Sequence, residues 1–277
     1  MDNFSIDAYT PSQIADRIEK AGITKSNGDP VSAFALAILA GAFIALGAAF
    51  FTLVVADSSL SFGLSRLLGG LVFCLGLVLV VVAGAELFTG NNLAVMAFVD
   101  GKVSFAGLLK NWFIVYLGNF IGALGILLLI YFSNYWLIGS GEVGTKAIVI
   151  ANSKVNLSWM EAFSRGILCN ILVCMAVWLC YAGRSVVDKV VAIIFPITAF
   201  VAMGFEHSVA NMYFIPAGLA AMTEADLLSP LTAINLESLS ISGFLLNNLL
   251  PVTLGNIVGG GVFVGLFYWF IYLRHDI

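Results

Sequence analysis

Two apolar stretches of the chain carry ionisable residues where a membrane segment would ordinarily carry none. One stretch contains Glu86, and the other contains Glu206 and His207. His207 is the only histidine inside an apolar stretch, and imidazole exchanges its proton near neutral pH. An ionisable group at membrane depth is a functional candidate by default, here as a proton donor or acceptor. A neutral histidine satisfied by its neighbours is the plain alternative.

The two stretches share the pattern G-x-E-x-x-x-x-N, at residues 84–91 and 204–211. Because Glu86 and Glu206 occupy equivalent positions, we expect them to do the same job in each copy. A carboxylate can accept hydrogen bonds from backbone N–H groups that a helix break exposes. The plainer interpretation is therefore that the motif shapes a loop, and direct proton transfer is the alternative. The four loop-shaping candidates are Glu86, Glu206, Asn91 and Asn211.

Two further polar residues and several bulky apolar residues lie near these motifs. Thr89 follows Glu86, and Asn170 sits in another apolar segment. Either could bind His207 or a substrate, and either could equally join two helices, the ordinary role of polar residues in bundles. Bulky apolar side chains beside the breaks could form dry constrictions that exclude water, or could simply face lipid. These are Phe73, Leu77, Leu87, Phe88 and Phe200.

The elements that position these residues are membrane segments. Of 277 residues, 61% are hydrophobic and 10% charged, against roughly a quarter charged in soluble domains. The apolar residues fall in runs of the length that crosses ~30 Å of hydrocarbon. The sequence therefore predicts an all-α membrane protein with six segments, at residues 31–56, 67–99, 112–141, 166–183, 190–222 and 243–273.

The second and fifth segments are each long enough for a continuous helix of roughly 50 Å, which exceeds the hydrocarbon thickness. We therefore expect both to be broken. Gly84, Gly90 and Glu86 mark one break, and Pro196, Gly204 and the Glu206-His207 pair mark the other. Broken helices direct N-terminal N–H groups, with their partial positive charge, toward the membrane centre. The breaks predict an anion site.

The third and sixth segments also match. Residues 111–122 and 248–259 both contain Asn, then Leu-Gly-Asn, then Gly at identical spacing. The chain thus predicts two copies of a three-segment unit. Because three is odd, the second copy is inverted across the membrane, and in such proteins interrupted segments at matching places indicate the substrate site.

Residues 1–29 predict a short amphipathic helix at the membrane surface. Thr10 is suited to be its N-cap, and Gly22 to be its end. Residues 30–273 form the six-segment domain, and residues 274–277 form a tail. Lys and Arg gather in the loops on the side of both termini, which predicts that both termini are cytoplasmic.

The sequence offers no sign of a cofactor, a metal or catalysis. Its four cysteines lie in apolar segments without His or Asp at ligand spacing, and no nucleophile–base pair or cofactor motif is present. The net charge of −4 is spread over loops and indicates no nucleic-acid partner. We expect a transport protein, with an integral-membrane enzyme or a neutral-solute pore as the rivals.

Over nearly its full length the chain resembles the formate/nitrite transporter family. The motifs that carry the resemblance are G-A-E-L-F-T at 84–89, G-R-S at 183–185, G-F-E-H-S-V-A-N-M at 204–212 and P-V-T-L-G-N at 251–256. Formate channels are the most similar branch, through Ser185 and the Tyr272-Leu273-Arg274 ending. Glu86 departs from this branch, which often has Asp there. Nitrite and hydrosulfide stay open as alternative substrates.

The resemblance implies a bacterial inner-membrane homopentamer with an aquaporin-like protomer, one pore in each protomer and lipid in the central axis. It implies that His207 is the central pore histidine, with Thr89 and Asn170 as polar neighbours. It adds Val173 to the constriction residues, and Lys25 and Lys154 as vestibule lysines that attract anions. A cytoplasmic regulator of the N-terminal helix stays open.

Overall fold

All regular secondary structure in residues 7–56 and 59–274, the part of the chain that this computed structural model describes, is helical. Five helices are long and apolar enough to cross a membrane. They are α2 (Pro30–Ala56), α3 (Phe62–Ala83), α6 (Phe105–Phe132), α8 (Trp159–Ala182) and the continuous run Gly243–Tyr272, which comprises η4 (Gly243–Leu249), α12 (Leu250–Ile257), η5 (Val258–Leu266) and α13 (Phe267–Tyr272).

The second and fifth segments are broken, as the sequence predicts. After α3 the second segment resumes as α4 (Phe88–Asn91), η1 (Asn92–Ala94) and α5 (Val95–Val99). The fifth segment comprises α9 (Val186–Ala202) and α10 (Ser208–Ala221). The expectation that Pro196 marks the second break is wrong, because Pro196 lies inside α9 and the helix continues past it.

Other boundaries differ from those expected. Helix α6 ends at Phe132 rather than near residue 141, and α8 begins at Trp159 rather than at 166. The predicted fourth segment covers only an uncharged run of the sequence. Helix α8 begins earlier because it includes two charged residues, Glu161 and Arg165, in its first two turns. The sequence did not reveal the surface elements η2 (Tyr135–Leu137), α7 (Glu142–Val155), α11 (Ala225–Leu228) and η3 (Ser229–Leu231).

The N-terminal helix α1 (Pro11–Asn27) begins as predicted, with Thr10 and Gln13 forming a reciprocal capping box. It does not end at Gly22, which was the expected stop. A Cβ at Gly22 would lie 3.1 Å from the Ala94 Cα, so this glycine instead lets α1 pack closely on η1. The predicted tail begins at Arg274, and residues 275–277 lie outside the described part of the chain.

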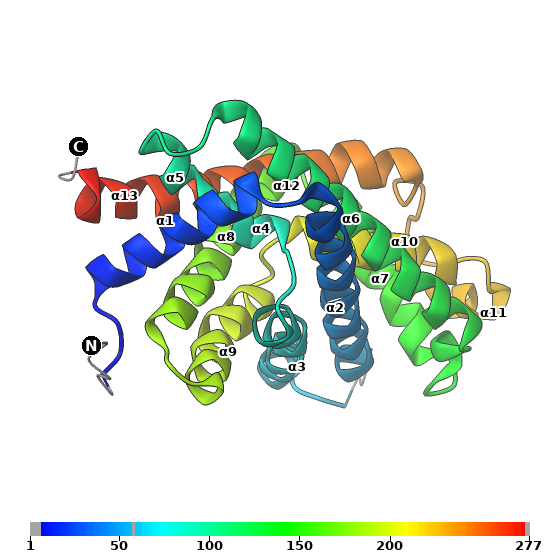
Figure 1. Ribbon diagram of the computed structural model, residues 1–277. Helices are drawn as coiled ribbons and strands as arrows, with labels where there is room; N and C mark the ends of the chain where they lie inside the picture. Colours follow the sequence, from blue (N-terminus) through cyan, green and yellow to red (C-terminus); the bar gives the residue numbers. More distant parts are fainter. Residues whose placement is uncertain (1–6, 57–58, 275–277) are drawn as a thin grey trace.

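The two surface helices that precede the halves, α1 and α7, lie at opposite ends of the bundle (Figure 1). Helices α1 and α13 lie at one end, and α7 and α11 lie at the other (Figure 1). Small residues allow equivalent close crossings in both halves. A Cβ at Gly122 would collide with the Ile38 carbonyl, and a Cβ at Gly259 would collide with the Ile167 carbonyl. The shared Asn/Leu-Gly-Asn/Gly pattern therefore places α6 against α2 and the sixth segment against α8.

Candidate pore site

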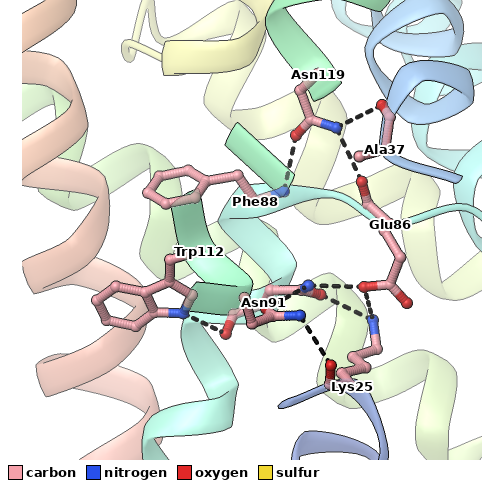
Figure 2. A network of polar contacts seen from close by, with 8 residues as sticks. Lys25, Ala37, Glu86, Phe88, Asn91, Trp112 and Asn119 are labelled. Carbon is pink, nitrogen blue, oxygen red and sulfur yellow. Dashed lines mark hydrogen bonds and ion pairs between the residues drawn. The ribbon is translucent and has the colours of Figure 1, made fainter. Parts of the chain in front are cut away.

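The first break lies between α3 and α4 and is held by an asparagine of α6. The chain turns at Gly84, whose φ of +82° is in the left-handed region that favours glycine. The Asn119 side-chain oxygen accepts the Phe88 N–H at 2.9 Å. Its amide group donates to the carbonyls of Glu86 at 2.9 Å and Ala37 at 2.8 Å (Figure 2). One side chain thus satisfies two of the backbone groups that the interruption exposes and ties them to α2.

The Glu86 carboxylate binds side chains instead of the backbone of the break. It accepts hydrogen bonds from Lys25 Nζ at 3.1 Å and Asn91 Nδ2 at 2.7 Å. Lys25 also donates to Asn91 Oδ1 at 2.8 Å, while Asn111 Nδ2 donates to the Lys25 carbonyl at 3.1 Å (Figure 2). The prediction that Glu86 accepts backbone N–H groups is wrong, because its partners are the side chains of Lys25 and Asn91. The carboxylate links the end of α1 to α4 and α6.

The second break repeats the arrangement of the first. Gly204 has a φ of +74°. Asn256 Oδ1 accepts the Ser208 N–H at 2.9 Å, and Asn256 Nδ2 donates to the carbonyls of Glu206 at 3.0 Å and Gly166 at 2.8 Å. Sequence reasoning quoted both Leu-Gly-Asn motifs but did not assign Asn119 and Asn256 a role at the breaks. Their identical places in the matching patterns of the third and sixth segments were the available signal.

The second glutamate has the equivalent lysine and asparagine partners and, in addition, a bond from a second asparagine. Glu206 accepts hydrogen bonds from Lys154 Nζ at 2.8 Å, Asn211 Nδ2 at 2.7 Å and Asn248 Nδ2 at 3.1 Å. Asn248 Nδ2 also donates to the Lys154 carbonyl at 2.9 Å. Since Lys154 ends α7 as Lys25 ends α1, the repeating unit includes a surface helix in addition to three membrane segments.

The two breaks meet through His207 and Thr89, which have no equivalent pair in the repeat. His207 Nε2 lies 2.9 Å from Thr89 Oγ1, and His207 Nδ1 accepts the Ala210 N–H at 3.0 Å as the N-cap of α10. Because Nδ1 is an acceptor, the neutral ring carries its proton on Nε2 and donates it to Thr89. The Thr89 hydroxyl hydrogen is then available to another acceptor. Both side chains are buried.

Asn170 supports this pair without bonding the imidazole. Its Nδ2 lies 3.3 Å from the Thr89 carbonyl, 2.8 Å from Asn92 Oδ1 and 2.7 Å from the Asn256 carbonyl. Among the hydrogen bonds of the described residues, none joins Asn170 to His207. The side chain therefore positions α4 and the sixth segment around the histidine.

Two cavities approach the pair from opposite ends, and they share no lining residue. The α1-side cavity, of about 350 Å³, is lined by Lys25, Glu86, Leu77 and Leu87, among others. The α7-side cavity, of about 140 Å³, is lined by Lys154, Glu206, His207, Phe73 and Phe200, among others. The Phe200 ring stacks on the imidazole with centroids 5.9 Å apart, and Phe73 meets Phe200 edge to face at 5.7 Å.

Two of the expected constriction residues lie elsewhere. Phe88 lines neither cavity, and its ring packs on Tyr116 with centroids 4.9 Å apart and on Trp112 at 6.3 Å. Val173 is buried within α8 and also lines neither cavity. The expected constriction residues that line the cavities are therefore Leu77 and Leu87 from one end, and Phe73 and Phe200 from the other.

Six membrane segments in two inverted halves, with two half-helices meeting at a histidine, define a polytopic membrane protein of the transport class. A model of the formate/nitrite transporter family matches residues 12–270. The formate channel FocA of Escherichia coli K12 is 42% identical over 98% of this chain and 96% of its own length. FocA of Haemophilus influenzae is 41% identical, over 97% and 96%.

A solved structure of a pentameric formate channel with formate bound superposes with a TM-score of 0.82. It is 41% identical, and the match covers 88% of this chain and 98% of that one. The chain belongs to the formate/nitrite transporter family, as its motifs predict. It is a multi-pass inner-membrane protein whose relatives are named channels and transporters.

Proposed function

We propose that this chain conducts formate across the cytoplasmic membrane through a pore within each subunit. The observation that carries the proposal is the contact between His207 and Thr89, which places an imidazole and a hydroxyl donor between the two cavities. The names of the FocA relatives, at 41–42% identity over nearly the whole chain, favour formate over nitrite and hydrosulfide.

The pore needs a proton because a bare carboxylate is costly to move past apolar side chains. Burying an unpaired ion costs several kcal/mol or more, and protonation removes most of that cost. Formate is almost wholly anionic at neutral pH, since small carboxyls have pKa values of roughly 3.3 to 3.9. The neutral acid must therefore be made inside the protein.

His207 and Thr89 are arranged to supply that proton in one exchange. When His207 is an imidazolium, formate takes the Thr89 hydroxyl proton while Thr89 takes the proton from Nε2. Formic acid and a neutral imidazole result, so charge and protons balance. Becoming an imidazolium requires a proton at Nδ1, which displaces the Ala210 N–H that Nδ1 now accepts. Charging His207 is therefore coupled to the cap of α10.

The vestibule lysines are only part of the attraction for anions. Lys25 is paired with Glu86, and Lys154 with Glu206, so each lysine is largely neutralised by its own carboxylate. Helix N-termini at α4 and α10 add partial positive charge at the breaks. On this proposal the two Lys–Glu pairs shape the loops, and other cations in the cavities attract the anion.

The remaining organisation completes the proposal. We assign both termini to the cytoplasm and the α7 end to the outside, on the distribution of Lys and Arg. We divide the chain into the surface helix at 1–29, the channel at 30–273 and the tail at 274–277. We expect a homopentamer, as the pentameric relative suggests. We further expect lipid in its central axis, and α1 is the element that a cytoplasmic regulator would contact.

The test is an anion series in planar bilayers with the purified protein. Formate, nitrite, hydrosulfide, acetate and chloride are compared by reversal potential, and we expect the highest permeability for formate. A higher permeability for nitrite or hydrosulfide would reassign the substrate within the family. Glycerol flux without any anion current would replace the proposal with a neutral-solute pore.

A further inference from the structure

The α7-side cavity contains two arginines that form no ion pair with a carboxylate in the described part of the chain. Arg66 of α3 and Arg165 of α8 both line it, together with Lys154. Lys154 is paired with Glu206, but neither arginine forms an ion pair within the described residues. Glu161, one turn before Arg165, instead accepts the Ser158 N–H at 2.9 Å as part of a capping box. The cavity therefore keeps the charge of both guanidinium groups.

Arg66 is fixed against the break that precedes His207. Its Nε donates to the Ala202 carbonyl, at the end of α9, at 2.8 Å. A Cβ at Gly204 would lie 2.6 Å from Arg66 Nη2, so this glycine leaves the space that the guanidinium occupies. Its Nη groups make no hydrogen bond among the described residues. They are free donors at the wall of the cavity.

Arg165 approaches the same break from α8. Its carbonyl accepts the Glu206 N–H at 3.2 Å, which ties α8 to the residue before His207. Both guanidinium groups line the same small cavity, where two like charges repel each other. Two cations held around one small cavity raise the energy of the empty state, and a bound anion lowers it.

The repeat shows that the scaffold does not need these two arginines. The Leu36 carbonyl accepts the Glu86 N–H at 3.2 Å as the Arg165 carbonyl accepts that of Glu206, so Leu36 is the counterpart of Arg165. Counting back from the two glutamates, Val186 is the counterpart of Arg66. Since the repeat carries Leu36 and Val186 at these two positions, we infer that the arginines serve something specific to the α7-side cavity.

We propose that Arg66 and Arg165 form a binding site for a small monovalent carboxylate, which holds the anion in the α7-side cavity before it reaches His207. A guanidinium presents a planar fork of N–H donors that matches the two oxygens of a carboxylate. The identity of the ligand as formate rests on the proposed function, whereas the site itself rests on the contacts above.

Occupancy of the site can be measured without transport. Ser153 lines the cavity and is exposed, while all four native cysteines are buried, so Ser153→Cys gives one reactive thiol there. Formate should slow the reaction of this thiol with a membrane-impermeant reagent. Adding Arg165→Leu should raise the half-protecting formate concentration about tenfold, since one charged hydrogen bond corresponds to about a decade of affinity.

Three variants make the result decisive. Lys146→Leu removes a cation from the same helix, α7, but outside the cavity, and should leave protection as it was. Arg165→Lys keeps the charge without the fork, and full protection in this variant would overturn the paired-guanidinium site in favour of general attraction. Arg66→Gln should weaken protection as Arg165→Leu does, with the oligomer checked by size-exclusion chromatography. Equal protection in all variants would also overturn the proposal.

The bilayer measurement separates this site from the channel function. With formate added on the face where the Ser153→Cys thiol reacts, Arg165→Leu should raise the half-saturating concentration by a factor similar to its loss of protection. Protection by formate without any formate current would keep the site and refute the proposed function. Formate current that is insensitive to both arginine variants, without protection, would keep the function and refute the site.

Discussion

Phe73 and Leu77 lie one helical turn apart on α3, yet they line different cavities. Leu77 faces the α1-side cavity, and Phe73 faces the α7-side cavity. Four residues of α-helix span roughly 6 Å. Both side chains are 2% exposed, so they pack against the pore interior and not against lipid. The barrier between the cavities is therefore about one helical turn thick along α3.

Shortening one side chain should open this barrier. We expect Leu77→Ala to raise formate conductance several-fold or to let acetate through, and Phe73→Ala and Phe200→Ala to act in the same direction. Each truncation also removes buried packing worth roughly 2–5 kcal/mol, so the oligomer must be confirmed. The measurement is single-channel conductance with formate and acetate. Leu75→Ala, at a position 39% exposed on the same helix, is the control. Unchanged flux and selectivity in all three pore variants would return these residues to ordinary packing.

Replacing the imidazole should uncouple formate import from pH. His207→Asn keeps a polar side chain of similar size that can cap α10 and bond Thr89, but it cannot become charged. We expect pH-dependent formate uptake by proteoliposomes to disappear, while some anion leak remains. Uptake by His207→Asn with the wild-type pH profile would contradict the proton exchange and leave His207 a structural residue.

The Thr89 hydroxyl should be required for the same exchange. Thr89→Ser keeps the hydroxyl, whereas Thr89→Val keeps the shape and removes it. We expect Thr89→Ser to retain pH-dependent uptake and Thr89→Val to lose at least about tenfold of it, because a donor to the anion and its link to His207 both vanish. The two variants are compared in the same uptake assay. Equal uptake rates for Thr89→Val and Thr89→Ser would show that the hydroxyl takes no part in the proton exchange.

The two Lys–Glu pairs should differ in their contribution to stability. Lys154 and Glu206 are 13% and 4% exposed at their side chains, against 30% and 14% for Lys25 and Glu86. Removing one partner of a buried pair costs about 3–5 kcal/mol, and solvent screening reduces that cost for an exposed pair. We therefore expect Lys154→Met to lower the thermal unfolding midpoint in detergent more than Lys25→Met does. The reverse order would contradict the structural role of the more buried pair.

Removing the Lys102 ammonium should make the docking of α1 depend on pH. Lys102 Nζ lies 2.7 Å from carboxylate oxygens of both Glu19 and Asp100. Burial raises the pKa of Glu19, which Lys102 partly offsets. Lys102→Met leaves two carboxylates facing each other, so the pKa of Glu19 rises further. A carboxyl whose pKa is raised on docking stabilises the docked state at low pH, and this contribution is lost as pH rises through that pKa.

Hydrogen exchange of the α1 amides measures this effect. In Lys102→Met, protection of α1 should be retained in acid and should fall toward neutral pH, and this fall should be larger than in the wild type, where Lys102 partly offsets the raised pKa of Glu19. Lys110→Met, which removes an exposed cation at the start of α6, is the control. Greater protection at neutral pH than in acid would show that the Glu19 and Asp100 repulsion does not govern docking.

The sequence by itself determined the membrane segments and the places where two of them break. The length of an uncharged run can be compared directly with the thickness of the hydrocarbon layer. The paired G-x-E-x-x-x-x-N motifs interrupt two runs that are too long to be single spans. Boundaries marked by charged residues, such as the start of α8, were less accurate, because a helix can extend beyond the membrane into water. Helix α7 was not predicted, because it lies outside the long apolar runs that the prediction used.

Only the tertiary structure decided which groups meet at the centre. His207 and Thr89 are 118 residues apart, and their counterparts in the repeat, Leu87 and Val209, carry no polar group. No periodicity within either segment reports such a contact, because it depends on the docking of two inverted halves, which Asn170 of the second half supports by donating to Thr89 and Asn92 of the first. Local sequence spacing determined where the helices break. The packing of distant segments determined which side chains meet between the two breaks.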